Sequence, residues 1–230
     1  MTADIFAAGF RPEPYWWDDV PRDDTAGLPA AALPSRADVV VIGSGYAGLH
    51  AAISLARTGS DVVLLEAASL GFGASTRNGG MVSGGVNLGK HTSIEGARAD
   101  EMLAEAAESY SWFESFIRDE GIDAVYQRCG RFVGAHCEAA WQRQADSLAR
   151  LNYIASSGAS MVPPAQSRDH VDTGFYCGGM LLDRSGAVHP ARLHHGVLGV
   201  AAAAGVGLFG NIRAGRITRA GTGLSVETSQ

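Results

Sequence analysis

Hydrophobic positions are most regular between Asp38 and Glu66. An uninterrupted apolar run, Val39 to Ile42, predicts a strand that is buried on both faces. Tyr46 to Arg57 then repeats apolar residues at helical spacing, and a second apolar run, Val62 to Leu65, leads into Glu66. A strand, a helix and a strand within about 30 residues predict a βαβ unit of the size used by dinucleotide-binding domains.

The same patterns predict the elements that follow. Apolar residues at helical spacing indicate one helix, or two in tandem, over 93–120, with Gly121 as the C-cap, and another helix over about 138–156. Pro190 suits the first turn of a helix that extends through Ala204. Strands are expected at 124–127, 131–135, 205–210, 213–219 and 224–228, the last two as a hairpin.

A glycine motif, Gly43 to Gly48, joins the first strand to the first helix. Gly43 allows a tight turn, Gly45 leaves room for a pyrophosphate, and Gly48 lets the helix pack closely. The helix N-terminus offers N–H groups to phosphates, and Glu66 can accept hydrogen bonds from both hydroxyls of a ribose. A plain glycine-rich turn is the alternative, but the complete strand–helix–strand context favours a dinucleotide site. Because a carboxylate at a strand tip supports no core, replacing Glu66 is expected to leave the fold unchanged.

A glycine-rich run from Ser69 to Gly85 follows this unit. Glycine loses more backbone entropy on ordering than other residues do, so such a run is costly to order without a partner. Its small residues and N–H groups suit wrapping around a ligand. A flexible loop is the alternative, and the position directly after Glu66 weakens it.

Composition narrows the classes of function. The chain has 230 residues, a net charge of −6 and no basic cluster, which argues against nucleic acid as a partner. The N-terminus does not resemble a signal peptide, and the longest apolar stretch, 196–210, is too short to span a bilayer, so no transmembrane segment is expected. Cys129, Cys137 and Cys177 form neither a disulfide framework nor a metal motif, which favours a cytoplasmic location.

Two other groups of residues invite a functional interpretation. His189, His194 and His195 lack a carboxylate or cysteine at ligand spacing, so cap or surface histidines are expected and no metal. Trp16 and Trp17 are expected to lie across the main domain and hold the N-terminal segment, with a place at a substrate entrance as the alternative.

Several motifs occur together in the order of one family. They are Tyr15-Trp16-Trp17, Asp38 to Leu49, Leu65-Glu66-Ala67, Gly71 to Gly80, Gly89-Lys90, Gly121-Ile122-Asp123, Gly130, Gly178-Gly179 and His189-Pro190. With these motifs the chain resembles the FAD-dependent amine and amino-acid oxidoreductases of the D-amino-acid-oxidase-like (DAO) superfamily, most of all the γ-glutamylputrescine oxidoreductase branch. The segment Ser75 to Gly80 is more specific than the glycine motif alone.

The resemblance implies an α/β fold. It consists of a Rossmann-like FAD-binding domain of the glutathione-reductase type and an inserted α+β portion of a substrate domain. An N-terminal arm would occupy 1–36, the FAD-binding domain 37–90 and 186–230, and the insertion 91–185. Relatives continue beyond the 224–228 strand, so we expect the C-terminal part of the family fold to be absent and the FAD-binding domain to be incomplete.

The resemblance also implies a set of cofactor-binding residues. They are Gly43, Ser44, Gly45, Tyr46, Ala47, Gly48, Glu66, Ala67, Ser75, Thr76, Arg77, Asn78, Gly79, Gly80, Met81 and Ala214. The glycine motif would carry the pyrophosphate, Glu66 the ribose, and Ala67 and Ala214 the adenine. Residues 75–78 would follow the phosphates and the ribityl chain, and 79–81 would approach the isoalloxazine.

The implied function is oxidation of the C–N bond of a small amine or amino acid, with hydride transfer to FAD. No catalytic residue is assigned. Two alternatives stay open. One is a catalytically incompetent dinucleotide-binding remnant, and the other is an NAD-dependent dehydrogenase, which would show another βα unit soon after Glu66.

The incomplete domain carries a further expectation. The strand Val39 to Ile42 would offer an unpaired apolar edge, through which the chain would self-associate. The flavin pocket would also stay open to water. By itself the chain is therefore expected to bind FAD poorly and to oxidise no amine.

Overall fold

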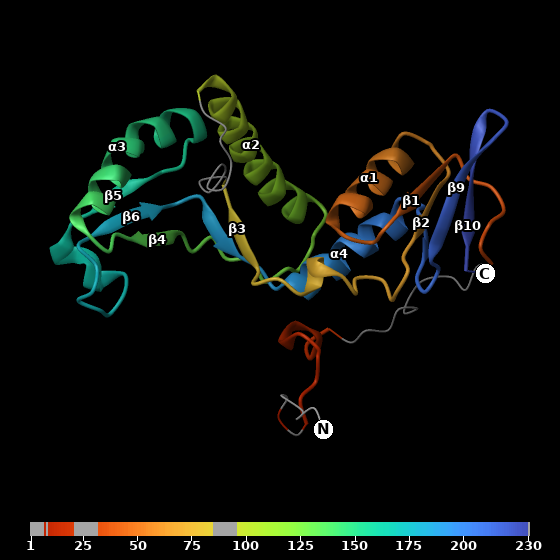
Figure 1. Ribbon diagram of the computed structural model, residues 1–230, viewed down its shortest axis with the longest axis horizontal. Coiled ribbons are helices and arrows are strands. Elements are labelled where there is room, and N and C mark those ends of the chain that lie inside the picture. The colour runs from red at the N-terminus through yellow and green to blue at the C-terminus, as the bar shows by residue number, and fades with distance from the viewer. Residues whose placement is uncertain (1–6, 8, 21–31, 85–95, 230) are drawn as a thin grey trace, which may run out of the picture. The chain divides into compact units, whose positions relative to one another are not determined.

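The computed structural model describes residues 7, 9–20, 32–84 and 96–229 (Figure 1). The chain divides into two compact units, one formed by 1–79 and 189–230 and the other by 80–188. The predicted Gly89-Lys90 motif, the first three residues of the 93–120 helix and much of the N-terminal arm lie outside the described residues. The predicted functional boundaries at 36, 90 and 185 stay predictions.

A parallel sheet organises the first unit. Its strands are β1 (Val39–Ile42), β2 (Val62–Leu65) and β8 (Gly207–Phe209), in the order β1-β2-β8. Helix α1 (Tyr46–Arg57) connects β1 to β2, and α4 (Pro190–Ala203) precedes β8. These elements confirm the predicted βαβ unit, the predicted helix from Pro190 and the predicted strand after it.

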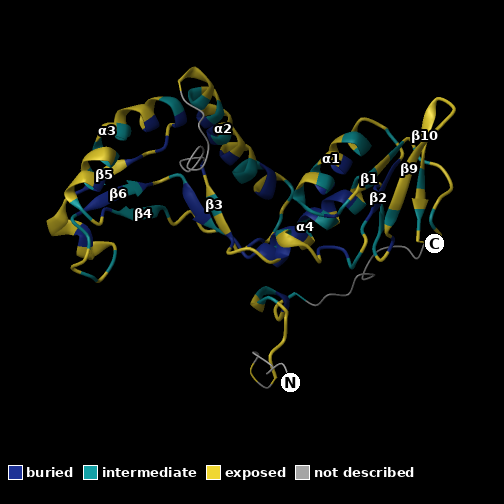
Figure 2. Ribbon diagram, viewed as in Figure 1, coloured by how far each residue is buried: buried dark blue, intermediate teal, exposed yellow. Residues whose placement is uncertain are grey.

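The two faces of this sheet are covered by different elements. Helix α1 packs on β1, β2 and α4, and its Leu49, Ala52 and Ile53 are buried. A hairpin of β9 (Ala214–Ala220) and β10 (Gly223–Thr228) follows, as predicted, and its base joins a small core with Val63 and Leu65 of β2. All of β2 is buried, whereas most of the hairpin is exposed (Figure 2).

The prediction that β1 is buried on both faces is wrong. Val40 is 37% exposed and Ile42 is 54% exposed, while Val39 and Val41 are partly buried. Val40 pairs with Val63 and Ile42 with Leu65, so all four side chains lie on the hairpin face of the sheet. The core on that face includes Val63 and Leu65 but neither Val40 nor Ile42, so among the described residues this face of β1 is not part of a core.

An antiparallel sheet organises the second unit. Its strands are β4 (Arg131–Gly134), β5 (Ser160–Val162) and β6 (Gly179–Leu182), in the order β4-β6-β5. Helices α2 (Ala97–Asp119) and α3 (Glu138–Ala155) pack on each other, and their buried residues share a core with Met180 and Leu182. A separate pair is formed by β3 (Met81–Ser83) and β7 (Ser185–Ala187).

Two expectations for the second unit have different outcomes. The C-cap of α2 is Glu120 and not Gly121 as expected, but Gly121 follows it with φ of +65°, the left-handed conformation common just after a helix. The strand predicted at 124–127 is wrong, because only Gln127 forms a β-bridge, to Ala187. Val125 has φ of +49°, and this left-handed conformation cannot continue a strand.

Neither a membrane span nor a disulfide is found in the described part of the chain. None of the helices described there combines the length and the apolar character that crossing a bilayer requires. Cys129 is exposed, Cys137 and Cys177 are half-buried, and all three are unpaired.

Gly48 offers a test of how α1 packs on β1. A Cβ built on Gly48 would lie 2.0 Å from the carbonyl oxygen of Gly43, so Gly48→Ala must push the helix away from the strand. We expect it to lower the free energy of unfolding by about 1–3 kcal/mol or more, the range for overpacking. Chemical denaturation measures the change.

Gly199→Ala is the matched control. Gly199 lies within α4, and a Cβ there would meet nothing within 4 Å. Alanine is the better helix former, so this variant should gain about 0.5–1 kcal/mol. Equal effects of the two substitutions would contradict the close packing of α1 on Gly43.

Candidate functional site

The glycine motif forms a tight turn at the carboxyl end of β1. Gly43 has φ of +102°, and its N–H donates to the carbonyl oxygen of Leu65 at 2.8 Å, which continues the pairing of β1 with β2. Gly45 is the N-cap residue of α1, and a Cβ there would lie 3.3 Å from the Ser75 hydroxyl. The turn therefore brings the N-terminus of α1 to the end of the sheet, where its free N–H groups can face an anion.

The carboxylate of Glu66 holds this turn. Its Oε2 accepts hydrogen bonds from the N–H and the hydroxyl of Ser44, both at 2.9 Å, and its Oε1 accepts from Ala68 N–H at 3.1 Å. Partial burial acts to raise the pKa of Glu66, but the hydrogen bonds from Ser44 and the following backbone outweigh it and lower the pKa. The carboxylate thus ties the glycine turn to the end of β2. The expectation that replacing Glu66 leaves the fold unchanged stays a prediction.

His194, a residue of α4, contacts the backbone of Ser44. Its Nε2 lies 2.6 Å from the carbonyl oxygen of Ser44, and because that oxygen can only accept, Nε2 carries the proton. The side chain is 2% exposed, and burial lowers its pKa. The expectation that His194 is a cap or surface histidine is therefore wrong. Its spacing in the sequence could have indicated the burial, because His194 lies on the same buried face of α4 as Val197 and Ala201.

The other two histidines agree better with expectation. His189 is the N-cap of α4, where its Nδ1 accepts from the N–H of Arg192 at 3.2 Å, and His195 is exposed. Within the described ranges no three His, Cys, Asp or Glu side chains gather as a metal site would require.

Within residues 71–78 of the glycine-rich run, side chains form hydrogen bonds to the backbone of the same segment. The Thr76 hydroxyl donates to the carbonyl oxygen of Gly71 at 2.6 Å, and the Asn78 amide donates to Ala74 and Ser75 carbonyls at 3.1 and 3.0 Å. The Ser75 hydroxyl accepts from the N–H of Tyr46 at 3.2 Å. We call residues 71–79 the flavin arm, after the cofactor contacts that the family resemblance implies for residues 75–79.

Arg77 contacts aromatic rings. Its guanidinium lies 4.3 Å from the ring centre of Trp17 and 4.3 Å from that of Phe72, and Nε donates to the Phe72 carbonyl at 2.7 Å. Such stacking is a favourable cation–π arrangement. The direct phosphate contact that the resemblance implies for Arg77 stays a prediction.

The first unit brings together most of the predicted cofactor-binding residues. They are Gly43, Ser44, Gly45, Tyr46, Ala47, Gly48, Glu66, Ala67, Ser75, Thr76, Arg77, Asn78, Gly79 and Ala214. Ala214 opens β9 beside the core of Val63 and Leu65. Gly80 and Met81 belong to the second unit, where Met81 is 67% exposed in β3, and their relation to the glycine turn stays a prediction.

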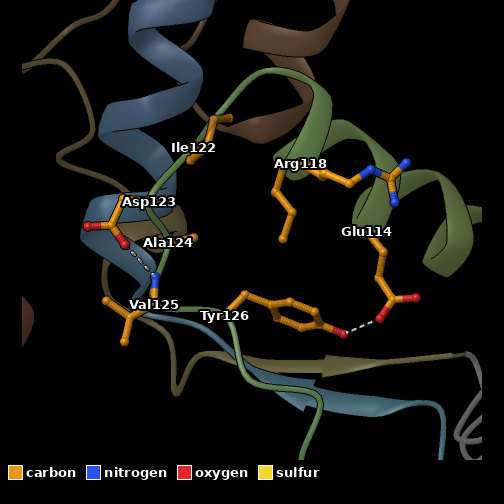
Figure 3. Close-up of a pocket in the computed structure, with 8 residues that line it drawn as sticks. Glu114, Arg118, Ile122, Asp123, Ala124, Val125 and Tyr126 are labelled. Atoms are coloured by element: carbon orange, nitrogen blue, oxygen red, sulfur yellow. Dashed lines mark hydrogen bonds between the residues drawn. The ribbon is translucent and has the colours of Figure 1, made fainter.

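The second unit contains a hollow that the sequence did not suggest. It measures about 550 Å³ and is lined by Glu114, Ile117, Arg118, Ile122, Asp123, Ala124, Val125 and Tyr126 (Figure 3). Tyr126 donates its hydroxyl proton to Glu114 at 2.6 Å, and Tyr110 OH lies 2.7 Å from Tyr126 OH. Burial, followed by the bond to Glu114, raises the pKa of Tyr126 well above its usual value, so the phenol stays protonated.

A parallel sheet with a glycine turn and an acid at the end of the second strand defines a dinucleotide-binding protein. The sequence profile of the FAD dependent oxidoreductase family (DAO) matches residues 38–230, and the chain belongs to this family. The family resemblance, the α/β fold and FAD as the family's cofactor are thereby confirmed.

Individual relatives agree with this assignment. The chain is 28% identical over 221 residues to the probable oxidoreductase OrdL of Rhizobium meliloti, covering 94% of this chain and 51% of that protein. It is 32% identical over 164 residues to the gamma-glutamylputrescine oxidoreductase of Escherichia coli, covering 68% and 37%. The crystal structure of glycine oxidase from Geobacillus kaustophilus matches with a TM-score of 0.74 at 19% identity, covering 85% and 52%, which is a similarity of fold. The chain spans about half the length of the proteins it matches.

The role of Glu66 in the turn can be tested by substitution. Glu66→Ala removes the acceptor of both Ser44 donors, and we expect a loss of about 1.5 kcal/mol of folding free energy. That is the low end for hydrogen bonds to a charged group, because the carboxylate is partly exposed. Denaturant titration measures it, with the exposed Glu108 of α2 replaced by alanine as the control.

The same variant carries a pH dependence. The folded-state pKa of Glu66 is below its ordinary value of 4.5, so its stabilising effect is present above that value and is lost as the pH falls through the folded-state pKa. The difference in stability between wild type and Glu66→Ala should therefore shrink on acidification. A difference that is constant from neutral to strongly acidic pH would contradict the assignment.

Proposed function

We propose that this chain contributes the FAD-binding site of an oxidoreductase that acts on the C–N bond of an amine or amino acid. The observation that carries the proposal is the joining of Glu66 to the glycine turn at the N-terminus of α1, with the flavin arm across it. Membership of the FAD dependent oxidoreductase family supports it. The names of the relatives, among them a glycine oxidase and a gamma-glutamylputrescine oxidoreductase, support the substrate class.

The geometry of the turn fits a dinucleotide. Gly45 has no Cβ, so a pyrophosphate can approach the backbone closely at the N-terminus of α1, where Ser75 already contacts Tyr46 N–H. Ser44 donates two hydrogen bonds to Oε2 of Glu66 and Ala68 donates one to Oε1, so we infer that Oε1 is the oxygen that receives a ribose hydroxyl. Ala67 and Ala214 would border the adenine, and residues 75–81 would follow the rest of the cofactor.

When bound, FAD supplies the acceptor for a hydride from the substrate carbon that carries the nitrogen. The residues of this chain hold and orient that group. The helix N-terminus offers a partial positive charge to the phosphates. The lowered pKa of Glu66 keeps its carboxylate ionised at neutral pH, as an acceptor for the ribose hydroxyls. No residue of the described chain is proposed as a catalytic acid or base.

Localisation and association belong to the same proposal. Three unpaired cysteines support a reducing, cytoplasmic location. Within the described residues β1 pairs only with β2, and its exposed Val40 and Ile42 support the expected self-association through a sheet edge. Sizing chromatography over a range of concentrations tests this, and a monomer at all concentrations would contradict it.

One measurement distinguishes the proposed oxidoreductase from a catalytically incompetent dinucleotide-binding remnant. With FAD in excess and oxygen removed, an amine substrate such as glycine, sarcosine or a putrescine derivative should bleach the visible bands of the flavin bound to an oxidoreductase. Flavin binding without bleaching by any such amine favours the remnant. The expectation that these 230 residues turn over no amine stays a prediction, and the same assay decides it.

Cofactor choice gives a direct prediction. We expect wild-type protein to bind FAD in preference to NAD, because the flavin arm follows β2 where a dehydrogenase would continue with another βα unit. Gly45→Val places a branched side chain against the Ser75 hydroxyl, where the pyrophosphate must pass, and should abolish FAD binding. Titration with each cofactor, followed by flavin or NADH fluorescence, measures both affinities.

Gly199→Val is the control for this variant. A Cβ at Gly199 meets nothing within 4 Å, so the substitution adds the same side chain to α4 away from the glycine turn. It should leave FAD affinity unchanged. Tighter binding of NAD than of FAD, or undiminished FAD binding by Gly45→Val, would show that the cofactor site is elsewhere.

A further inference from the structure

Two tryptophans of the N-terminal segment donate hydrogen bonds to the flavin arm. Trp17 Nε1 donates to the Thr76 hydroxyl at 3.1 Å, and Trp16 Nε1 donates to the Asn78 carbonyl at 2.8 Å. Trp17 is 9% exposed, and both residues belong to one short 3₁₀ helix, Tyr15–Trp17. These contacts confirm that the aromatic segment packs on the main domain, and because both indole N–H groups are engaged they disfavour a substrate entrance.

The bond from Trp17 is the first of a connected series. The Thr76 hydroxyl has one proton, which it donates to the Gly71 carbonyl at 2.6 Å, so its lone pair is what receives Trp17. The N–H of Gly71 donates to the Ser44 hydroxyl at 2.9 Å, and that hydroxyl donates to Glu66. Four linked hydrogen bonds therefore run from Trp17 to the carboxylate that we assign to the ribose.

Two further contacts fix the same segment. The guanidinium of Arg77 lies over the rings of both Trp17 and Phe72, whose own centres are 6.2 Å apart. His189 accepts a hydrogen bond at Nδ1, so its buried Nε2 carries the proton, and Asp19 Oδ2 lies 3.4 Å from it. The segment thus contacts both the flavin arm and the N-terminus of α4, the helix that holds Ser44 through His194.

We propose that residues Trp16–Asp19 are a positioning clamp for the FAD site, with Trp17 acting through Thr76 and Gly71 on Ser44 and Glu66. The inference rests on the proposed FAD function, and it adds that cofactor affinity depends on a segment some 60 residues away in the sequence. The physical reason is pre-organisation. A glycine-rich arm that is already ordered loses less entropy when the cofactor binds.

The test removes one hydrogen-bond donor and keeps the aromatic ring. Trp17→Phe should weaken FAD binding about five- to tenfold, the effect of losing one ordinary hydrogen bond. In the FAD-free protein it should also speed amide hydrogen exchange in residues 71–78. Tyr15→Phe is the matched control, since Tyr15 is 73% exposed and keeps its ring, and it should change neither quantity.

Variants of Thr76 show whether Trp17 acts through the hydroxyl. Thr76→Ser keeps the hydroxyl and should retain FAD affinity, whereas Thr76→Val is nearly isosteric and should lose it. If the two residues share one interaction, Trp17→Phe should weaken binding much less in the Thr76→Val background than in wild type. Additive effects of the two substitutions would overturn the route through Thr76.

The remaining outcomes separate this inference from the proposed function. Absence of FAD binding by wild type would remove the proposed function, while the exchange rates of 71–78 would still test whether Trp17 orders the arm. Faster exchange in Trp17→Phe with unchanged FAD affinity would show a merely structural contact and overturn the positioning role. Unchanged exchange and unchanged affinity would overturn the clamp altogether.

Discussion

The pairing of Ser44 with Glu66 is the interaction on which the site depends. Parallel pairing of β1 with β2 continues through the hydrogen bond from Gly43 N–H to the Leu65 carbonyl. Ser44 and Glu66, the next residue of each segment, therefore leave the sheet side by side. The carboxylate then accepts both donors of Ser44 at 2.9 Å. A half-buried carboxyl group without such donors would have a raised pKa and would ionise less readily. Here the charge that shapes the turn is also the group available to a ligand.

His194 completes the hold on Ser44 without adding a positive charge. Burial lowers its pKa, and the neutral ring still donates through Nε2 to the Ser44 carbonyl. A lowered folded-state pKa means that the unfolded chain binds the proton more readily, so this contribution to stability is also lost as the pH falls. The stabilising effects of Glu66 and of His194 are therefore both lost at low pH, and acid should loosen the glycine turn that they hold.

Local patterns predicted the elements of the site better than their surroundings. The βαβ unit, the turn at Gly43 and the helix from Pro190 follow from periodicity and from the chemistry of glycine and proline, which act within a few residues. The exposure of Ile42 and the burial of His194 depend on what packs over them. His194 meets Ser44 across 150 positions of the chain, and no local pattern records such a partner. The route from Trp17 to Glu66 was invisible for the same reason.

Arg77 shows how a residue type can be predicted while its contact is not. Family resemblance assigns it to the phosphates, whereas in the structure its guanidinium lies over the rings of Trp17 and Phe72. Its two aromatic partners lie 5 and 60 positions away in the chain, so the motif around Ser75 predicts the residue type but not its contact. The role of Arg77 toward a bound anion therefore stays a prediction.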